Sequence, residues 1–196
     1  VFERGLGHST YYLLAEGAEG IEAVLPLVHT RSLLFGNTLS SLPFCTFAGT
    51  LASNPEARAV IEARAVEIGQ ELGVGAVEFR LLAAGGSNRA VKTLYDIFTK
   101  PIDPDIDKNM AAIRSKQRNV IRKGIKNGLV PRIDSVENFY PVYAESVRNL
   151  VTPVFPRSLF RSIHGTFPGQ VEIISACLDD RVVSTSMCFF YKKWMC

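Results

Sequence analysis

A run of basic residues is the strongest candidate for chemistry in this chain. The segment Lys108–Lys126 holds seven basic residues and no acidic one. Four basic residues of this segment are spaced four apart, namely Arg114, Arg118, Arg122 and Lys126. On a helix they would form a ridge of like charges that repel one another, and an anionic partner would relieve that cost. The ridge therefore predicts binding of a phosphate-bearing partner; the alternative is a solvated helix face.

A second candidate follows the proline-rich loop Thr152–Pro156. Arg157 begins a short predicted helix directly after this loop, and a rigid loop places a side chain accurately. A guanidinium in such a place can bind phosphate or carboxylate through two parallel hydrogen bonds. Tyr143, on the preceding predicted helix, could donate a proton or position a substrate. The alternatives are a surface arginine beside a packing loop and an aromatic side chain of the core.

Several classes of enzyme lack their motifs. The chain has no G-x-S-x-G, no P-loop, no dinucleotide-binding fingerprint and no zinc-ligand spacing. His8, His29 and His164 are isolated in the sequence. The four cysteines form no C-x-x-C pair; they are Cys45, Cys177, Cys188 and Cys196. Small buried thiols in a reducing cytoplasm are the simplest interpretation, and no metal site is predicted.

Composition sets broad limits. The 196 residues, 47% hydrophobic and 21% charged, predict one large or two small globular domains. The net charge of +3 is too small to indicate nucleic acid by itself. No apolar run is long enough to span a membrane, and the N-terminal segment lacks the features of a signal peptide. The last residues, Trp194–Cys196, lie in or just past an apolar strand, which predicts further polypeptide beyond them.

The first hundred residues predict a mixed α/β lobe of order ββ, loop, αββ. The expected strands are 11–15, 21–29, 76–82 and 93–99, and residues 16–20 are expected to form a hairpin turn between the first two. Asn54 and Pro55 signal a helix that runs to about Leu72. Its expected apolar face comprises Ala57, Val60, Ile61, Ala65, Ile68 and Leu72. The apolar loop before it, from Leu33 to Leu51, is expected to line or cover a cleft.

From Pro101 onward the expected order is α, β, α, α, β, β. Helices are predicted at 106–126, 136–150 and 157–164, and strands at 129–133, 171–178 and 182–192. Ser135 is the predicted cap of the second of these helices. The last two strands form a hairpin across Asp179 and Asp180. On the long helix, a count of about 100° per residue turns Gln117 and Ile121 toward the core and Arg122 away from it.

Stretches along nearly the whole chain resemble the FemAB family of N-acyltransferases. The matching residues are R-S-K-Q-R-N-V-I-R-K-G-I-K-N-G-L, F-Y-P-V-Y-A-E-S-V-R-N-L and T-P-V-F-P-R-S-L-F, within 114–160. Three further segments resemble a subgroup associated with exosortase (PEP-CTERM) and exopolysaccharide gene clusters. These are H-S-T-Y-Y-L-L-A, P-L-V-H-T-R-S-L-L-F-G and C-T-F-A-G-T.

The resemblance implies two GNAT-like lobes with mixed sheets, residues 1–100 and 101–196, with the second lobe incomplete. It implies transfer of an aminoacyl or acyl group to an amine of a cell-envelope (peptidoglycan) or exopolysaccharide-related acceptor. Aminoacyl-tRNA or acyl-CoA would be the co-substrate, with no other cofactor, and the location would be cytoplasmic. The expected substrate-binding residues are Arg118, Arg122, Lys123, Arg157 and Tyr143, and no catalytic residue is named. The alternative is a non-catalytic module whose basic helix holds RNA or an anionic polysaccharide.

Overall fold

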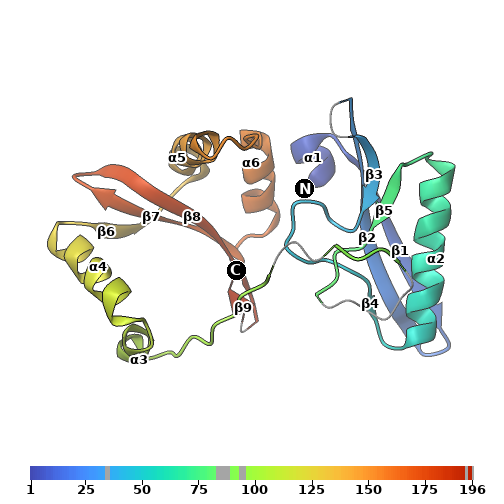
Figure 1. The fold of residues 1–196 in the computed structure, drawn as a ribbon, viewed down its shortest axis with the longest axis horizontal. Helices are drawn as coiled ribbons and strands as arrows, with labels where there is room; N and C mark the ends of the chain where they lie inside the picture. Colours follow the sequence, from blue (N-terminus) through green and yellow to red (C-terminus); the bar gives the residue numbers. More distant parts are fainter. Residues whose placement is uncertain (34–35, 83–88, 93–95, 193, 196) are drawn as a thin grey trace. The chain divides into compact units, whose positions relative to one another are not determined.

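The computed structural model describes residues 1–33, 36–82, 89–92, 96–192 and 194–195, and the chain divides into two compact units (Figure 1). The first unit comprises Phe2 and Gly7–Phe98. The second comprises Val1, Glu3–Leu6 and residues 99–196. Each unit combines a sheet with helices, so the predicted mixed α/β class is confirmed.

The first unit is built on a mixed sheet of order β1-β2-β3-β5, with β4 paired to β2. Its strands are β1 (Ser9–Gly17), β2 (Gly20–Ser32), β3 (Gly36–Ser40), β4 (Leu51–Ala52) and β5 (Ala76–Glu78). The pair β3–β5 is parallel, and the other pairs are antiparallel. The predicted hairpin is present: Gly17 pairs with Gly20 across a tight turn.

One helix, α2 (Pro55–Glu71), packs on this sheet. The Asn54 side chain caps it by accepting a hydrogen bond from the Ala57 N–H at 2.7 Å. The buried core between helix and sheet comprises Ala23, Leu25, Leu27, Leu39, Ala57, Ile61, Ala65 and Ile68.

Val60, expected in the apolar face, is exposed instead, whereas Glu62 on the opposite margin is buried. The Thr50 hydroxyl donates a hydrogen bond to the Glu62 carboxylate at 2.9 Å, and Arg89 forms an ion pair with the same carboxylate.

The predicted loop from Leu33 to Leu51 contains strand β3, which the sequence analysis missed. The strand was hidden because its residues are mostly polar, and these polar groups bond across the sheet. Thr38 and Thr30 lie hydroxyl to hydroxyl at 2.7 Å, and the Asn37 side chain meets His29 Nε2 at 2.6 Å. The predicted strand 76–82 is shorter than expected. Of the predicted strand 93–99, residues 96–99 have no regular structure, and 93–95 lie outside the described residues.

The sheet of the second unit has the order β6-β7-β8-β9. Its strands are β6 (Val130–Ile133), β7 (Val171–Leu178), β8 (Arg181–Tyr191) and β9 (Trp194–Met195). Asp179 and Asp180, with φ of 48° and 62°, form the predicted hairpin turn between β7 and β8. The described pairs are all antiparallel, so the mixed sheet expected of both lobes is found only in the first. The two predicted helices connect β6 to β7, which runs in the opposite direction to β6.

Helices α5 (Val136–Asn149) and α6 (Arg157–Thr166) cover one face of this second sheet (Figure 1). Their buried contact with the sheet comprises Val136, Phe139, Phe160 and Ile173. Ser135 caps α5 as predicted, because its hydroxyl accepts a hydrogen bond from the Asn138 N–H at 3.3 Å. Residues 3–6 of the short helix α1 (Phe2–Leu6) belong to this unit, and the Ser158 hydroxyl on α6 donates to the Gly5 carbonyl at 2.9 Å.

The helix predicted over 106–126 is two helices, α3 (Ile106–Ala111) and α4 (Ser115–Lys126). A continuous helix would hold Arg114, Arg118 and Arg122 in repulsive contact at successive i,i+4 positions. The break takes Arg114 out of the helix interior, to the position before its first turn.

Neither α3 nor α4 has a buried residue. The expectation that Gln117 and Ile121 face the core is therefore wrong, since both side chains are exposed. The helical count places them correctly on one face of α4, but no other described element covers that face.

The close approach of α1 to α6 predicts a selective effect at Gly5. A Cβ there would lie 2.9 Å from the Leu159 Cα, which is backbone and cannot turn aside. Gly5→Ala should lower the free energy of unfolding by about 1–3 kcal/mol, as overpacking does. Gly165→Ala in α6 is the matched control, because nothing lies within 4 Å of its Cβ position. Urea denaturation that shows equal stability for both variants would contradict this contact.

Candidate functional site

The carboxylate of Asp134 ties three elements of the second unit together. It follows β6 and precedes α5, and its side chain is only 4% exposed. Its Oδ1 accepts hydrogen bonds from the Ser135 N–H at 2.9 Å and from Asn138 Nδ2 at 2.7 Å. Its Oδ2 accepts from Arg132 Nη2 at 2.9 Å, and Ser175 on β7 adds a further hydrogen bond.

This environment fixes the charge of Asp134. Burial by itself would raise the pKa of the carboxyl group. The hydrogen bonds from Asn138, Arg132, the Ser135 backbone and Ser175 outweigh burial, and they hold the pKa well below its usual range. Asp134 is thus an ionised, fully bonded anchor. The sequence analysis did not single it out, although an acid directly between a strand and a capped helix start was the available signal.

The helix that Asp134 anchors carries an aromatic cluster shared with α6. The Tyr143 ring stacks on Phe139 with centroids 5.4 Å apart and meets the edge of Phe160 at 4.6 Å. Burial raises the pKa of the Tyr143 phenol, against a weaker opposing effect from a hydrogen bond with the Phe155 backbone. The phenol therefore stays protonated at neutral pH. The aromatic contacts agree with the core interpretation of Tyr143, and its half-buried position keeps the substrate-binding prediction open.

Arg157 begins α6 as predicted and lies on the exposed side of the same cluster. Its guanidinium carbon is 4.7 Å from the centre of the Tyr140 ring, and its Nη1 donates to Glu137 Oε2 at 3.1 Å. Arg161, one turn later, donates to both oxygens of Glu137 at 2.9 and 3.1 Å. The bonds from Arg161, and then the charges of both arginines, lower the pKa of Glu137. Arg157 is held in place and keeps other N–H groups for a ligand.

The basic residues of α4 lie elsewhere in the second unit. Arg118 Nη1 donates to the carbonyls of Met110 and Ala111 at 3.4 and 3.3 Å, long bonds that cap the end of α3. Arg122 and Lys123 are exposed, and no described side chain pairs with them in an ion pair. Figure 1 shows α4 on the side of the sheet away from α5 and α6. The structure therefore brings Arg157 and Tyr143 together but keeps both apart from the α4 residues.

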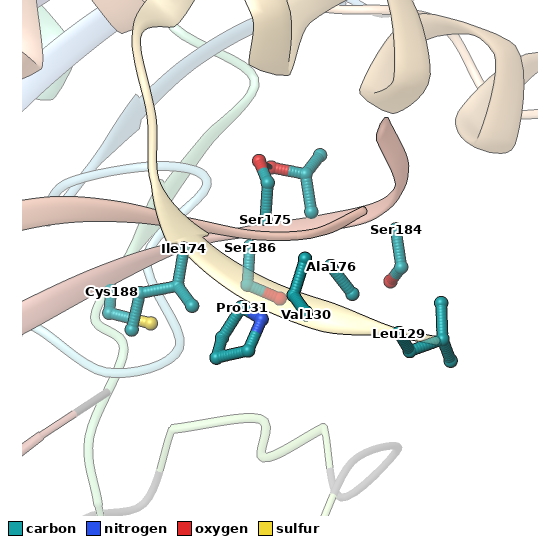
Figure 2. Close-up of a pocket in the computed structure, with 10 residues that line it drawn as sticks. Leu129, Val130, Pro131, Ile174, Ser175, Ala176, Ser184, Ser186 and Cys188 are labelled. Atoms are coloured by element: carbon teal, nitrogen blue, oxygen red, sulfur yellow. Dashed lines mark hydrogen bonds between the residues drawn. The ribbon is translucent and has the colours of Figure 1, made fainter. Parts of the chain in front are cut away.

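A hollow of about 330 Å³ lies on the sheet face opposite α5 and α6. Its lining residues are Leu129, Val130, Pro131, Ile174, Ser175, Ala176, Ser184, Thr185, Ser186 and Cys188. Figure 2 shows Pro131, Ile174 and Cys188 pointing to one side of the sheet and Ser175 to the other. The hollow is mostly apolar, with small hydroxyl groups along β8. Sequence analysis did not find it, because its residues come together only through the strand register.

Other kinds of site are absent from the described part of the chain. No three histidine, cysteine or acidic side chains among those residues gather as metal ligands would. No helix within the described ranges combines the length and apolar character needed to cross a membrane.

Comparison with known proteins finds a similar fold but no similar sequence. No family model and no curated protein sequence matches the chain. Among solved structures, FemX is similar, with a TM-score of 0.55 and 15% sequence identity, over 88% of this chain and 49% of FemX. The chain thus spans about half the length of FemX. The likeness confirms the expected Fem-type fold. The exosortase-associated subgroup and the pairing of two GNAT-like lobes stay predictions.

The Asp134 anchor predicts a large loss of stability from an isosteric change. Asp134→Asn keeps the shape but removes the charge that Arg132 and the Ser135 N–H bond to, and charge-assisted hydrogen bonds contribute about 1.5–3 kcal/mol each. We expect a loss of at least that size in urea denaturation. Asp179→Asn, in the exposed hairpin turn, is the control and should change stability by less than about 0.5 kcal/mol. An equal loss of stability at the two positions would show that the Asp134 carboxylate contributes no more to stability than an exposed one.

The same carboxylate predicts a pH dependence. Because its pKa is lowered in the folded state, its contribution to stability is complete above the unfolded value of about 3.9 and is lost as the pH falls below that value. The difference in unfolding free energy between the native chain and Asp134→Asn should therefore be constant near neutrality and shrink below about pH 4. A difference that stays constant down to the acid transition would contradict the assignment.

Proposed function

We propose that the chain belongs to an acyltransferase that moves an aminoacyl or acyl group from an activated donor to an amine of a cell-envelope or exopolysaccharide-related acceptor. The observation that carries this proposal is the likeness in fold to FemX over 88% of the chain. The donor would be aminoacyl-tRNA or acyl-CoA, acting as co-substrate with no other cofactor. A cytoplasmic location and the exosortase-associated subgroup are parts of the same proposal.

In this reaction the protein itself needs to form no covalent bond with a substrate. The acceptor nitrogen attacks the carbonyl carbon of the ester or thioester, a C–N bond forms, and the C–O or C–S bond to the donor breaks. One proton passes from the amine to the leaving oxygen or sulfur. Orientation of the two substrates can supply about 7–11 kcal/mol of the barrier reduction, so no covalent nucleophile is required.

Each group of predicted site residues has a role in this proposal. Arg157, fixed by Glu137 and Tyr140, would bind a carboxylate or phosphate of one substrate, and the protonated Tyr143 would orient it. Arg118, Arg122 and Lys123 would contact phosphates of the other substrate. The two groups lie on opposite sides of the second sheet in Figure 1, so they would act on different substrates or on distant parts of a long one.

A second candidate function is a non-catalytic module that holds RNA or an anionic polysaccharide. The observation that favours it is the exposure of Arg122 and Lys123 on a helix without acidic residues. Such a module needs only the basic face, whereas the enzyme also needs the Arg157 and Tyr143 group.

Activity measured with the full-length protein separates the two functions. Radiolabelled aminoacyl-tRNA or acyl-CoA should transfer its label to amine acceptors. Arg157→Ala should lower kcat/KM about tenfold or more, since a charge-assisted contact is lost. Arg148→Ala, which removes an exposed cation of α5 that does not contact Glu137, is the control and should leave transfer within about twofold, as surface changes away from a site do. Absence of transfer from either donor would favour the binding module.

The basic ridge gives a separate prediction. Arg118→Ala combined with Arg122→Ala should leave the melting temperature nearly unchanged, because neither residue is buried. It should weaken binding to charged tRNA or to a phosphate-bearing acceptor about tenfold or more. Arg148→Ala, an exposed cation of α5, controls for the loss of charge alone. Early unfolding of the double variant would make these arginines structural, and unchanged binding would make the ridge a solvated face.

A further inference from the structure

The apolar and basic residues of α4 lie on separate halves of the helix. With Val120 taken as zero and about 100° per residue, the apolar arc runs to about 140° and the basic arc fills the remaining turn. The apolar arc contains Val120, Ile121 and Ile125, with Gln117 and Gly124 between them. The basic arc contains Arg118, Arg122, Lys126, Lys123 and Lys116.

The apolar arc of α4 is open to solvent. Val120 is 66% exposed, Ile125 64% and Ile121 38%. These are β-branched hydrocarbon side chains on a helix that has no buried residue, so their burial contributes nothing to the fold as described. Three apolar side chains aligned in this way on an uncovered helix favour an external partner.

The charge around α4 restricts that partner. From Lys108 to Ile133 the chain has eight basic residues and no acidic one. A second copy docked on this helix would bring like charges together. RNA would satisfy the basic arc but would leave Val120, Ile121 and Ile125 in water. A surface with negative charges above and hydrocarbon below satisfies both arcs.

We propose that α4 lies flat on an anionic lipid bilayer, with its apolar arc among the acyl chains and its basic residues on the headgroup phosphates. A cationic amphipathic helix is the common device for such binding, and it does not cross the membrane. Along its 12 residues α4 is about 18 Å long, room for three apolar anchors on one side. This inference concerns binding alone and does not require acyl transfer to occur.

Sedimentation of the chain with lipid vesicles tests this proposal. The chain should bind vesicles of equimolar phosphatidylglycerol and phosphatidylcholine and should not bind phosphatidylcholine alone. Arg122→Gln with Lys126→Gln should weaken binding about tenfold or more, because each basic residue near an anionic surface contributes about 1 kcal/mol. Val120→Ser with Ile125→Ser should weaken it by a similar factor, since each inserted side chain loses apolar burial.

Matched controls keep the test specific. Val60→Ser changes a valine of α2 that is also 66% exposed, and Arg148→Gln removes a cation from α5. Both should bind anionic vesicles like the native chain, and circular dichroism should show all variants folded. Absence of vesicle binding would overturn the proposal.

Two other outcomes would also overturn it. If the variant with Val120→Ser and Ile125→Ser binds anionic vesicles as tightly as the native chain, the apolar arc does not enter the bilayer. It is then covered in solution, for instance by the open face of the chain's own sheet. If the native chain binds tRNA but not vesicles, and only Arg122→Gln with Lys126→Gln abolishes tRNA binding, the surface is a nucleic-acid site. Because vesicle binding is measured without any acyl donor, its failure would leave the transferase proposal standing, and failure of transfer would leave membrane binding standing.

Discussion

The ionised carboxylate of Asp134 is the constraint on which the second unit depends. One side chain bonds to Arg132 on β6, to the first turn of α5 and to Ser175 on β7, so it fixes the angle at which α5 leaves the sheet. Glu137, Tyr140 and Tyr143 all lie on α5. The placement of Arg157 through Glu137 and Tyr140 therefore follows from a buried charge at the start of α5.

The two sides of the second sheet are stabilised in different ways. The α5 and α6 layer has a buried aromatic core, a capped helix and the Asp134 anchor, and it holds its polar groups in defined positions. On the other side, α4 has no buried residue, and the hollow on the face of β6, β7 and β8 is open. A rigid layer suits the positioning of reacting groups. An uncovered cationic helix suits recruitment to a large anionic surface, which tolerates variation in geometry.

Local signals in the sequence predicted most helices and hairpins. Asn54 and Ser135 marked helix starts, and Asp179-Asp180 marked a turn, because each acts through its own neighbours in the chain. Strand β3 escaped prediction because its polar side chains pair with His29 and Thr30, which a single-strand pattern does not show. The break between α3 and α4 and the exposure of Ile121 escaped for a related reason. Helical periodicity shows which residues share a face, but not whether another element covers that face.

The candidate site was predictable only in part. Arg157 was identified because a proline-rich loop precedes it, and the ridge on α4 because basic residues recur every four positions. Asp134 and the hollow depend on contacts between strands that are about forty residues apart, such as Arg132 opposite Ser175, and no local pattern encodes them.

Hydrogen exchange of the native chain and of Asp134→Asn at neutral pH tests the central claim most directly. If the carboxylate positions α5, its backbone amides should exchange at least tenfold faster in the variant, about 1.4 kcal/mol of lost local stability. The amides of α2, in the other unit, should exchange at the native rate. Unchanged protection across α5, together with native placement of Tyr143 in its ring contacts, would show that the aromatic cluster alone holds this layer and that Asp134 does not determine the site.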